Sequence, residues 1–304
     1  MTTSTDDAVS RGLAVLKDPQ DGRSGGPHQL SWRPSRAAVK TTLKLIPLGL
    51  IVVIAIFGPL FETYDPRKIV GQPDLAPSGT FLFGTDNSGF DVFSRVISGT
   101  RIDLLIGLFV TFIATVVGIT IGLLIGMNES KRGPLGMIAR GIARGIDLVQ
   151  AIPAIVIGLV VVAFYGASGM TLTLAIAIIV SPIQARLVRT EVLRVRSEAY
   201  LEAGRISGLS EFELTVRHVL PNSSWPAVEN TSFVFGIAIL LTASLGFLGV
   251  GLPPPTPEWG SMLATGAPDA VVGRWWSSTF PTIALALAVS SVAFAYSVYR
   301  EHRK

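Results

Sequence analysis

The chain has 304 residues, of which 49% are hydrophobic and 15% are charged, and its mean hydropathy is +0.54. Water-soluble domains carry about 25% charged residues, so this composition disfavours a soluble protein and predicts an integral membrane protein. The absence of cysteine excludes disulfides and thiolate metal sites. The net charge is +4, and the basic residues lie mainly in short segments between apolar runs, which argues against nucleic-acid binding.

The first 42 residues are polar and rich in Ser, Asp, Gly and Pro. They lack the early apolar core of a signal peptide. We expect this region to be a flexible cytoplasmic tail, followed by one transmembrane domain over residues 43–304.

Six apolar runs follow, each close to the roughly 20 residues that a helix needs to cross a bilayer. They cover residues 45–61, 104–127, 148–165, 170–185, 231–252 and 277–298. The sequence therefore predicts an all-α integral membrane fold with six transmembrane helices.

Basic residues between the runs predict the orientation, because Lys and Arg collect on the cytoplasmic side of a membrane. If all six runs cross, one side receives Arg33, Arg36, Lys40, Lys44, Lys131, Arg132, Arg140, Arg144, Arg186, Arg189, Arg194, Arg196, Arg205, Arg217, Arg300, Arg303 and Lys304. The loops 62–102, 166–169 and 253–276 fall on the other side, with only Arg67, Lys68, Arg95, Arg101 and Arg274. This asymmetry places both termini in the cytoplasm and makes 62–102 and 253–276 extracytoplasmic loops.

The polar segment between the fourth and fifth runs begins with a stretch that favours a helix, residues 190–207. Arg194 and Glu198 are four residues apart and can pair on one face of that helix. Gly208 follows, and glycine suits a helix C-terminus because it tolerates a left-handed backbone. We therefore expect this helix to end at a glycine hinge.

A second, short helix is predicted after the hinge. Ser210 and Glu213 have the spacing of a capping box, in which each side chain satisfies a free amide at a helix start. Pro221 cannot easily continue a helix, so we expect this one to end near Leu220. The segment 188–224 is either an ordinary connection between spans or a docking surface for a cytoplasmic partner.

Several single residues allow two interpretations. Asp147 lies at the start of the third run, where an acid is a candidate substrate contact; an ion pair with Arg144 near the membrane surface is the favoured interpretation. Gln150 and Pro153 could line a pathway or mark a kink, and we favour the kink. Three tryptophans are expected to be interfacial anchors: Trp259, Trp275 and Trp276.

The segment Tyr200 to Asn222, "YLEAGRISGLSEFELTVRHVLPN", resembles the EAA loop of ABC-importer permeases. The family pattern is EAA, three residues, Gly, nine residues, Ile, one residue and Leu-Pro. Here Gly204 replaces the second Ala and His218 replaces the Ile. The resemblance places the residues that couple to an ATPase at Glu202, Ala203, Gly204, Arg205, Gly208, His218, Leu220 and Pro221.

Two further stretches resemble the dipeptide and oligopeptide permeases of that family. They are "FGTDNSGFDVFSRVISGTRIDLLIG", in which Phe90 replaces an Arg of the family form, and "SLGFLGVGLPPPTPEWGSML". "RWWSSTFPTIALALAV" is similar too, whereas the final "YSVYREHRK" departs from the usual tail. The resemblance extends over about residues 40 to 298.

The resemblance implies a type I ABC-importer (MetI-like) transmembrane domain with a cytoplasmic coupling helix, in a bacterial plasma (inner) membrane. It implies a permease subunit for peptides or similar small solutes that forms half of the translocation pathway. The implied partners are a second homologous permease, one or two P-loop ATPases and an extracytoplasmic substrate-binding protein. ATP and Mg would be bound by the ATPases, and this chain would need no cofactor. The second, third and fifth spans are expected to line the pathway.

The chemistry of an enzyme is not evident in the sequence. No Lys follows a Gly, so the chain has no G-x-x-x-x-G-K-[ST] phosphate loop. The three histidines lack metal-ligand spacing. The alternatives to an importer subunit are a self-contained channel or secondary transporter, which would need no coupling loop, and a membrane-bound enzyme, which the missing motifs disfavour.

Overall fold

A computed structural model describes the backbone of residues 36–301 and the side chains of residues 43–298. The chain divides into two units, Met1–Val39 and Lys40–Lys304. Of the first unit, the structure describes only residues 36–39, which begin the first helix. The fold described below is therefore that of the second unit. Most of the predicted tail, residues 1–35, lies outside the described residues.

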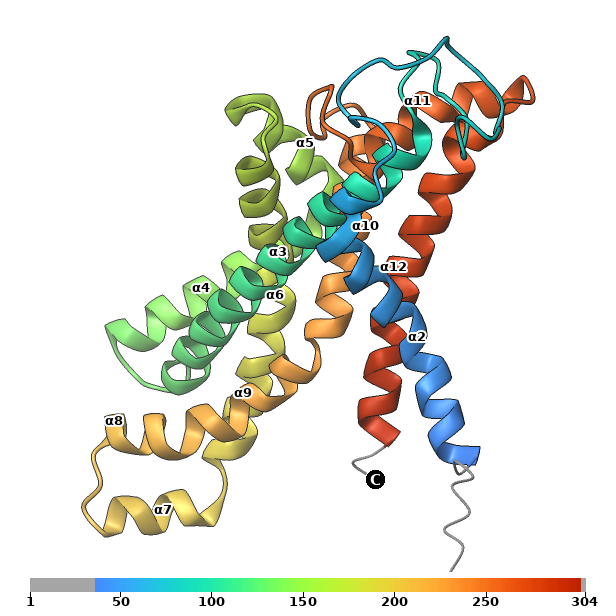
Figure 1. Cartoon of the computed structure of the whole chain (residues 1–304). Coiled ribbons are helices and arrows are strands. Elements are labelled where there is room, and N and C mark those ends of the chain that lie inside the picture. Colours follow the sequence, from blue (N-terminus) through green and yellow to red (C-terminus); the bar gives the residue numbers. More distant parts are fainter. Residues whose placement is uncertain (1–35, 302–304) are drawn as a thin grey trace, which may run out of the picture. The chain divides into compact units, whose positions relative to one another are not determined.

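The described residues are helical and connected by short loops, apart from a long loop after the first helix (Figure 1). In chain order the elements are α2 (Arg36–Phe57), the 3₁₀ turn η1 (Gly58–Leu60), α3 (Val92–Asn128), α4 (Pro134–Ala151), α5 (Ala154–Tyr165), α6 (Gly169–Arg196), α7 (Ala199–Ile206), α8 (Glu211–Leu214), the π-helical turn η2 (Thr215–Val219), α9 (Leu220–Glu229), α10 (Thr231–Phe247), α11 (Trp259–Val271) and α12 (Trp276–Glu301). The all-α prediction is confirmed.

Four described helical segments are long and apolar enough to cross a membrane, namely Leu43–Leu60, Val92–Asn128, Gly169–Arg196 and Trp276–Val298. Two pairs of consecutive helices, each bent at the break between them, are also long and apolar enough to cross when each pair is counted as one span. The first pair, α4 with α5, bends by 94°, and the second, Glu211–Glu229 with α10, bends by 47°. The number of candidate spans is thus four, or up to six.

The third predicted span is not one straight helix. The sequence interpretation treated 148–165 as a single run, but α4 ends at Ala151 and Pro153 is the N-cap of α5. Proline has no amide hydrogen, so it cannot continue the hydrogen-bond ladder of α4. The expected kink at Pro153 is confirmed, and it is a complete break between two helices. The fifth predicted run also ends early, because α10 stops at Phe247.

Close packing of α3 against α6 organises the centre of the fold. Gly118, Gly122 and Gly126 recur every four residues on α3, which places them on one face. A Cβ atom at Gly122 would lie 2.5 Å from the carbonyl oxygen of Ala185, and one at Gly126 would lie 2.7 Å from Cβ of Val192. Glycine at these positions lets the two backbones touch, as in small-residue contacts between transmembrane helices.

Three clusters of buried apolar side chains hold the bundle together. The central one joins α3, α5, α6 and α10. A second joins α2, α3, α11 and α12 and contains Trp259 and Trp276. A third, which includes Leu201 and Leu214, joins the far ends of α3 and α6 to α7, α8 and α9.

Two of the three tryptophans are therefore not interfacial anchors as predicted. Trp259 is 1% exposed, and its Nε1 donates to the carbonyl oxygen of Val96 at 3.2 Å. Trp276 is buried as well, and its Nε1 donates to the carbonyl oxygen of Thr85. An indole can be buried when its N–H finds an acceptor. Trp275 is exposed, and its role as an interfacial anchor stays a prediction.

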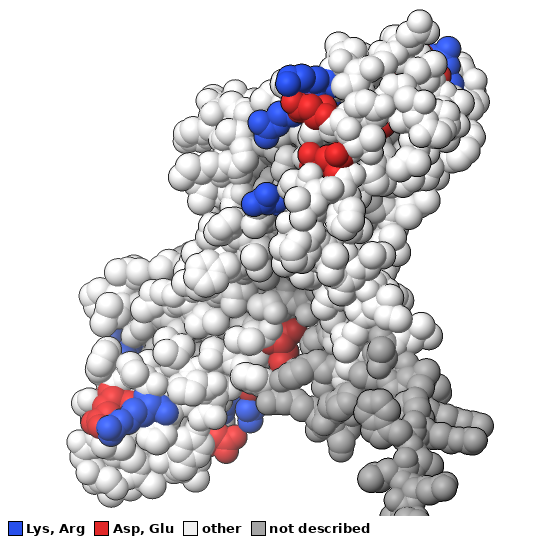
Figure 2. Space-filling model, viewed as in Figure 1, with Lys and Arg blue, Asp and Glu red and all other residues white. Residues whose placement is uncertain are grey.

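The two ends of the bundle differ. One end carries α7 and α8, and the other carries α11 and the loop between η1 and α3 (Figure 1). Figure 2 shows charged side chains gathered toward both ends of the visible face, with a broad uncharged band between them. This distribution is the one a membrane-crossing bundle needs, because charged side chains are costly in hydrocarbon.

Candidate functional site

The predicted coupling segment begins at the end of α6, which stops earlier than the sequence suggested. The prediction of a continuous helix over 190–207 is wrong, because α6 ends at Arg196 and α7 begins at Ala199. The hydroxyl of Ser197 donates to the carbonyl oxygen of Arg194 at 2.7 Å. A serine side chain that bonds to the backbone in this way competes with helix continuation. The pair of Arg194 with Glu198 is confirmed at 3.3 Å.

Gly208 closes α7 as the sequence predicted. Its φ is +85°, in the region that favours glycine. The Gly208 amide donates to the carbonyl oxygen of Arg205 at 3.0 Å, and the Leu209 amide donates to that of Gly204 at 3.1 Å. These two bonds are the Schellman pattern of a helix C-terminus. The turn reverses the chain and brings α8 back against α7.

The return helix α8 is fixed by a cap and an ion pair. Oγ of Ser210 accepts the Glu213 amide at 3.2 Å, which is one half of the predicted capping box. Nε of Arg205 lies 2.8 Å from Oε1 of Glu211 and links the two arms of the turn. The hydrogen bond from Arg205 holds the pKa of Glu211 below its usual value, and the same bond raises the pKa of Arg205. Both groups are therefore charged at neutral pH.

The second helix does not end near Leu220, so that prediction is wrong. The chain passes from α8 through the π-helical turn η2 into α9, which contains Pro221 in its first turn. The Leu220 amide donates to the carbonyl oxygen of Thr215, five residues earlier. A π-helical turn is wider than an α-helical turn and often occurs at functional sites. Its wider ladder accommodates a proline that would disrupt a regular α-helix at this point.

The residues of the predicted coupling site lie along this segment but do not converge on one point. Glu202 and Ala203 are exposed on α7, whereas Gly204 faces Leu214 of α8. His218 lies in η2, with its ring 6.0 Å from that of Tyr200.

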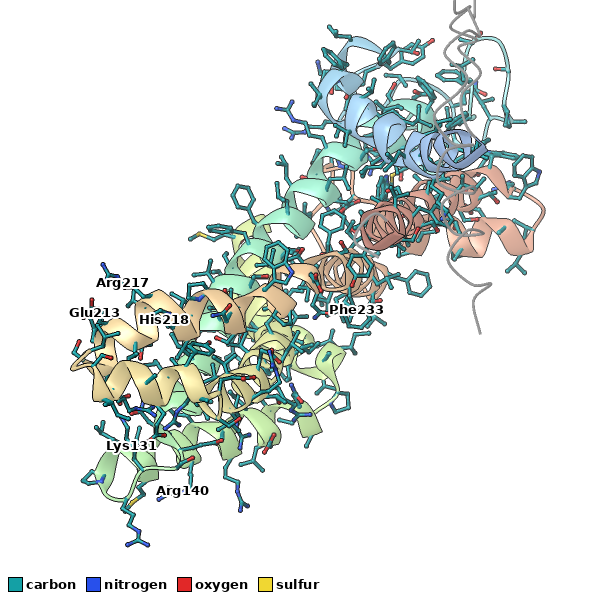
Figure 3. All side chains as sticks on the ribbon, turned by 90° about the horizontal axis from the view of Figure 1, so that it is seen from below. Lys131, Arg140, Glu213, Arg217, His218 and Phe233 are labelled. Carbon is teal, nitrogen blue, oxygen red and sulfur yellow. The ribbon has the colours of Figure 1, made fainter. Side chains whose placement is uncertain are left out.

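Figure 3 shows Glu213, Arg217 and His218 together along one side of the α8 to η2 segment. Glu213 and Arg217 form an ion pair at 2.6 Å. Leu220 and Pro221 lie in the first turn of α9, after these three residues in the chain. The segment is thus a helical hairpin whose surface carries both charged and apolar groups.

Sequence reasoning missed the apolar groups of this hairpin. Ile206 is 83% exposed and Phe212 is 79% exposed, one on each side of the turn at Gly208. Val216 is exposed one turn beyond Phe212. The surface of the hairpin therefore carries exposed apolar side chains as well as charged ones. The available signal was the Phe between two acids in "SEFEL".

Asp147 does not pair with Arg144, contrary to the favoured sequence interpretation. Its Oδ1 lies 2.8 Å from Nη2 of Arg186, on the neighbouring helix α6. The packing of α4 against α6 supplies a cation that a single-helix argument could not foresee. Arg144 instead lines an open cavity of about 640 Å³ with Arg140 and Asp147.

A buried carboxylate organises the opposite end of the bundle. Glu258 is fully buried and caps α11 by accepting the amides of Gly260 at 2.7 Å and Ser261 at 2.9 Å. Burial raises the pKa of Glu258 to about 7, although these two hydrogen bonds lower it. Asp103 of α3 is buried nearby and accepts the Trp259 amide at 3.0 Å. Among residues 43–298, no three His, Asp or Glu side chains form a group that could hold a metal ion.

Comparison with known proteins identifies relatives of this chain. Residues 118–302 match the family model of the binding-protein-dependent transport system inner membrane component. The di/tripeptide transport system permease protein of Pseudomonas aeruginosa is 37% identical over 82% of each chain. The probable D,D-dipeptide transport system permease protein of Escherichia coli is 35% identical over 92% of this chain and 91% of its own. The glutathione transport system permease protein of Shigella boydii is 35% identical over 93% of this chain and 90% of its own.

Solved structures give the same fold at lower identity. A chain of the inward-facing MetNI methionine ABC transporter aligns with a TM-score of 0.55 and 19% identity. The alignment covers 69% of this chain and 95% of that chain. The shared part is therefore nearly the whole of the smaller protein.

Proposed function

The chain belongs to the family of binding-protein-dependent transport system inner membrane components, and we propose that it is the subunit through which an ATP-driven importer carries peptides or similar small solutes. The relatives named above are permease proteins for di- and tripeptides, D,D-dipeptides and glutathione. These solutes share a peptide bond or a peptide-like backbone and charged ends. The substrate class follows from these names, and the individual solute does not.

The observation that carries the coupling role is the helical hairpin α7–α8. Its tip combines the exposed apolar residues Ile206 and Phe212 with a turn fixed by Gly208 and by the pair of Arg205 with Glu211. A rigid tip with apolar anchors can insert into a groove of another protein. We assign that groove to a cytoplasmic P-loop ATPase, whose movement would pass through η2 and α9 to α10.

The membrane arrangement follows from counting each bent pair as one span. Six spans place both termini and the hairpin on one side, where the basic residues gather, and that side is the cytoplasm. Residues 62–91 and the region of α11 then face outward, where a substrate-binding protein would dock. Six spans form half of a pathway, so a second homologous permease completes it. The complex contains one or two ATPases, which bind ATP and Mg.

A self-contained channel or secondary transporter is the alternative function. The family is one of binding-protein-dependent transport systems, and the relatives are permease proteins of transport systems for peptides or glutathione, which favours the importer. The hairpin also has no purpose in a protein that works without an ATPase.

The test is purification of the tagged chain from its native membrane, followed by mass spectrometry and by uptake in liposomes. We expect a second permease and P-loop ATPases in stoichiometric amounts, and peptide uptake that requires ATP and the binding protein. Recovery of the chain alone, still able to move solute without ATP, would overturn the proposal in favour of the channel.

A further inference from the structure

The ion pair between Asp147 of α4 and Arg186 of α6 lies between two open cavities on the surface of this chain. Arg186 is ten residues before the end of α6, which is about 15 Å along the helix axis at ~1.5 Å per residue. The two side chains are 53% and 51% exposed in this chain. Charges within a membrane face a partner or a water-filled path, because hydrocarbon does not solvate them. Half-exposed charges of this kind suit a surface that faces water or a partner chain.

The pair connects two cavities. Arg186 lines an open cavity of about 430 Å³, which we call the α6 pocket, with Gln150, Ile183, Leu187, Thr190, Asn230 and Phe233. Asp147 lines the larger cavity near Arg140 and Arg144. Figure 3 shows Phe233 at the side of the bundle, away from the hairpin tip. A molecule that moves from one cavity to the other passes the ion pair.

The α6 pocket has the chemistry of a binding site for a peptide end. Arg186 uses Nη2 for Asp147, and a guanidinium has five N–H donors, so further donors remain for a second carboxylate. Nδ2 of Asn230 donates to Oε1 of Gln184 at 3.1 Å, so the Asn230 oxygen is left as an acceptor. The Phe233 side chain is 58% exposed and gives the pocket an apolar wall.

We propose that the α6 pocket binds a peptide in transit, with Arg186 pairing with the terminal carboxylate and Asp147 pairing with the terminal ammonium group. This site rests on the proposed peptide import. A zwitterion carries both charges, so its binding exchanges one ion pair for two and leaves no charge unpaired. Binding and release of a zwitterion also leave the net charge of the site unchanged. An exchange that leaves no charge unpaired avoids the cost of a lone charge away from water.

Cysteine labelling tests whether the α6 pocket is an open path. The chain contains no cysteine, so Phe233→Cys introduces a single thiol. In the complete complex in nanodiscs, we expect a water-soluble methanethiosulfonate reagent to modify Phe233→Cys. A matched control is Ile178→Cys, because Ile178 is 62% exposed on α6 but lines neither cavity. No labelling at Phe233→Cys would mean that the partner permease or lipid covers the pocket, and would overturn the proposal.

Protection of that thiol tests the ligand chemistry. We expect alanyl-alanine to slow the labelling of Phe233→Cys, and alanyl-alanine amide, which lacks the carboxylate, to protect at least about tenfold less well. Adding Arg186→Gln should remove this difference, and Arg186→Lys should keep part of it. Equal protection by both peptides in the native background, or no protection by either, would contradict the proposal.

A second variant separates recognition from a structural role. Asp147→Asn removes the proposed partner of the ammonium group, so alanyl-alanine should lose its advantage over N-acetyl-alanyl-alanine, while its advantage over the amide should remain. If the pair only holds α4 against α6, Asp147→Asn and Arg186→Gln would weaken protection by all three peptides alike, and the site would be refuted. ATP-dependent peptide uptake by the unmodified complex distinguishes this failure from a failure of the proposed function.

Discussion

At the scale of the residue, backbone conformation at one glycine determines whether the α7–α8 hairpin can form. The turn at Gly208 needs a positive φ, and the two hydrogen bonds after α7 depend on it. A β-branched residue in this conformation is strained by about 1–2 kcal/mol. The sequence indicated this position correctly because glycine after a helix has a specific physical meaning.

Gly208→Val should abolish ATP-driven uptake while the chain still inserts into the membrane. The strain shifts the hairpin tip, so ATPase retention in a pull-down assay should fall as well. Gly166→Val is the matched control. Gly166 follows the last residue of α5 and has φ +81°, and, as at Gly208, no atom lies within 4 Å of a Cβ built there. Normal uptake by Gly208→Val would refute the role of the hinge.

Glu258 gives a pH dependence that can be worked out from its surroundings. Its pKa is raised from 4.5 to about 7, so between these values the folded protein binds a proton that the unfolded chain releases. The contribution of Glu258 to stability is then largest below about pH 4.5 and falls as pH rises toward 7, by about 3 kcal/mol in total. We expect the melting temperature of the purified complex to fall across this interval. Glu258→Gln should flatten the profile, and an unchanged profile would assign the effect to other groups.

At the scale of the element, contacts between helices corrected the predictions made from single helices. The hydropathy pattern located the apolar parts of α2, α3, α6, α10 and α12, because apolar runs depend only on composition. It did not identify the break at Ile152–Pro153 as a 94° bend, nor the partner of Asp147, because both depend on how α4, α5 and α6 pack. The π-helical turn was also missed, since nothing local distinguishes Pro221 as a helix end from Pro221 within a widened helix.

The contact between α3 and α6 is sensitive to side-chain volume at Gly122. Gly122→Leu would place atoms against the carbonyl oxygen of Ala185, and backbone cannot move aside as a flexible side chain can. We expect a loss of about 1–3 kcal/mol or more in stability, seen as lower yield and a lower melting temperature. Gly49→Leu is the control, because no atom lies within 4 Å of a Cβ built at Gly49 in α2. Equal melting temperatures of both variants would contradict the packing argument.

At the scale of the whole molecule, the chain is a permease subunit of a larger transport system, and the α7–α8 hairpin and α11 lie at opposite ends of its bundle. The EAA resemblance located the hairpin, but the residues that it singled out between Glu202 and Pro221 did not include Ile206 and Phe212. Exposure is a property of the folded chain, so composition alone could not rank these side chains. The α6 pocket likewise needs three helices that lie far apart in the sequence.

Changes on the hairpin surface should weaken ATPase binding without affecting the membrane part. Phe212→Ser removes an apolar anchor and should reduce ATPase affinity by at least about tenfold, as for a central interface residue. Glu202→Lys reverses a charge on α7 and should weaken co-purification too. Phe164→Ser is the control, since Phe164 is 83% exposed on α5, away from the hairpin. Unchanged co-purification of both hairpin variants would argue against docking through this face.

The π-helical turn before α9 sets the rotational phase between the hairpin and the membrane helix that follows it. A π-helical turn holds one residue more than an α-helical turn, and each residue of an α-helix advances the chain by about 100°. Deleting one residue from 215–219 would therefore let the helix run on regularly and rotate everything before it by about a quarter turn. Phe212 would then point in a new direction while every contact of α10 stayed the same. The direction in which this protein presents its coupling surface is thus set by a single inserted residue.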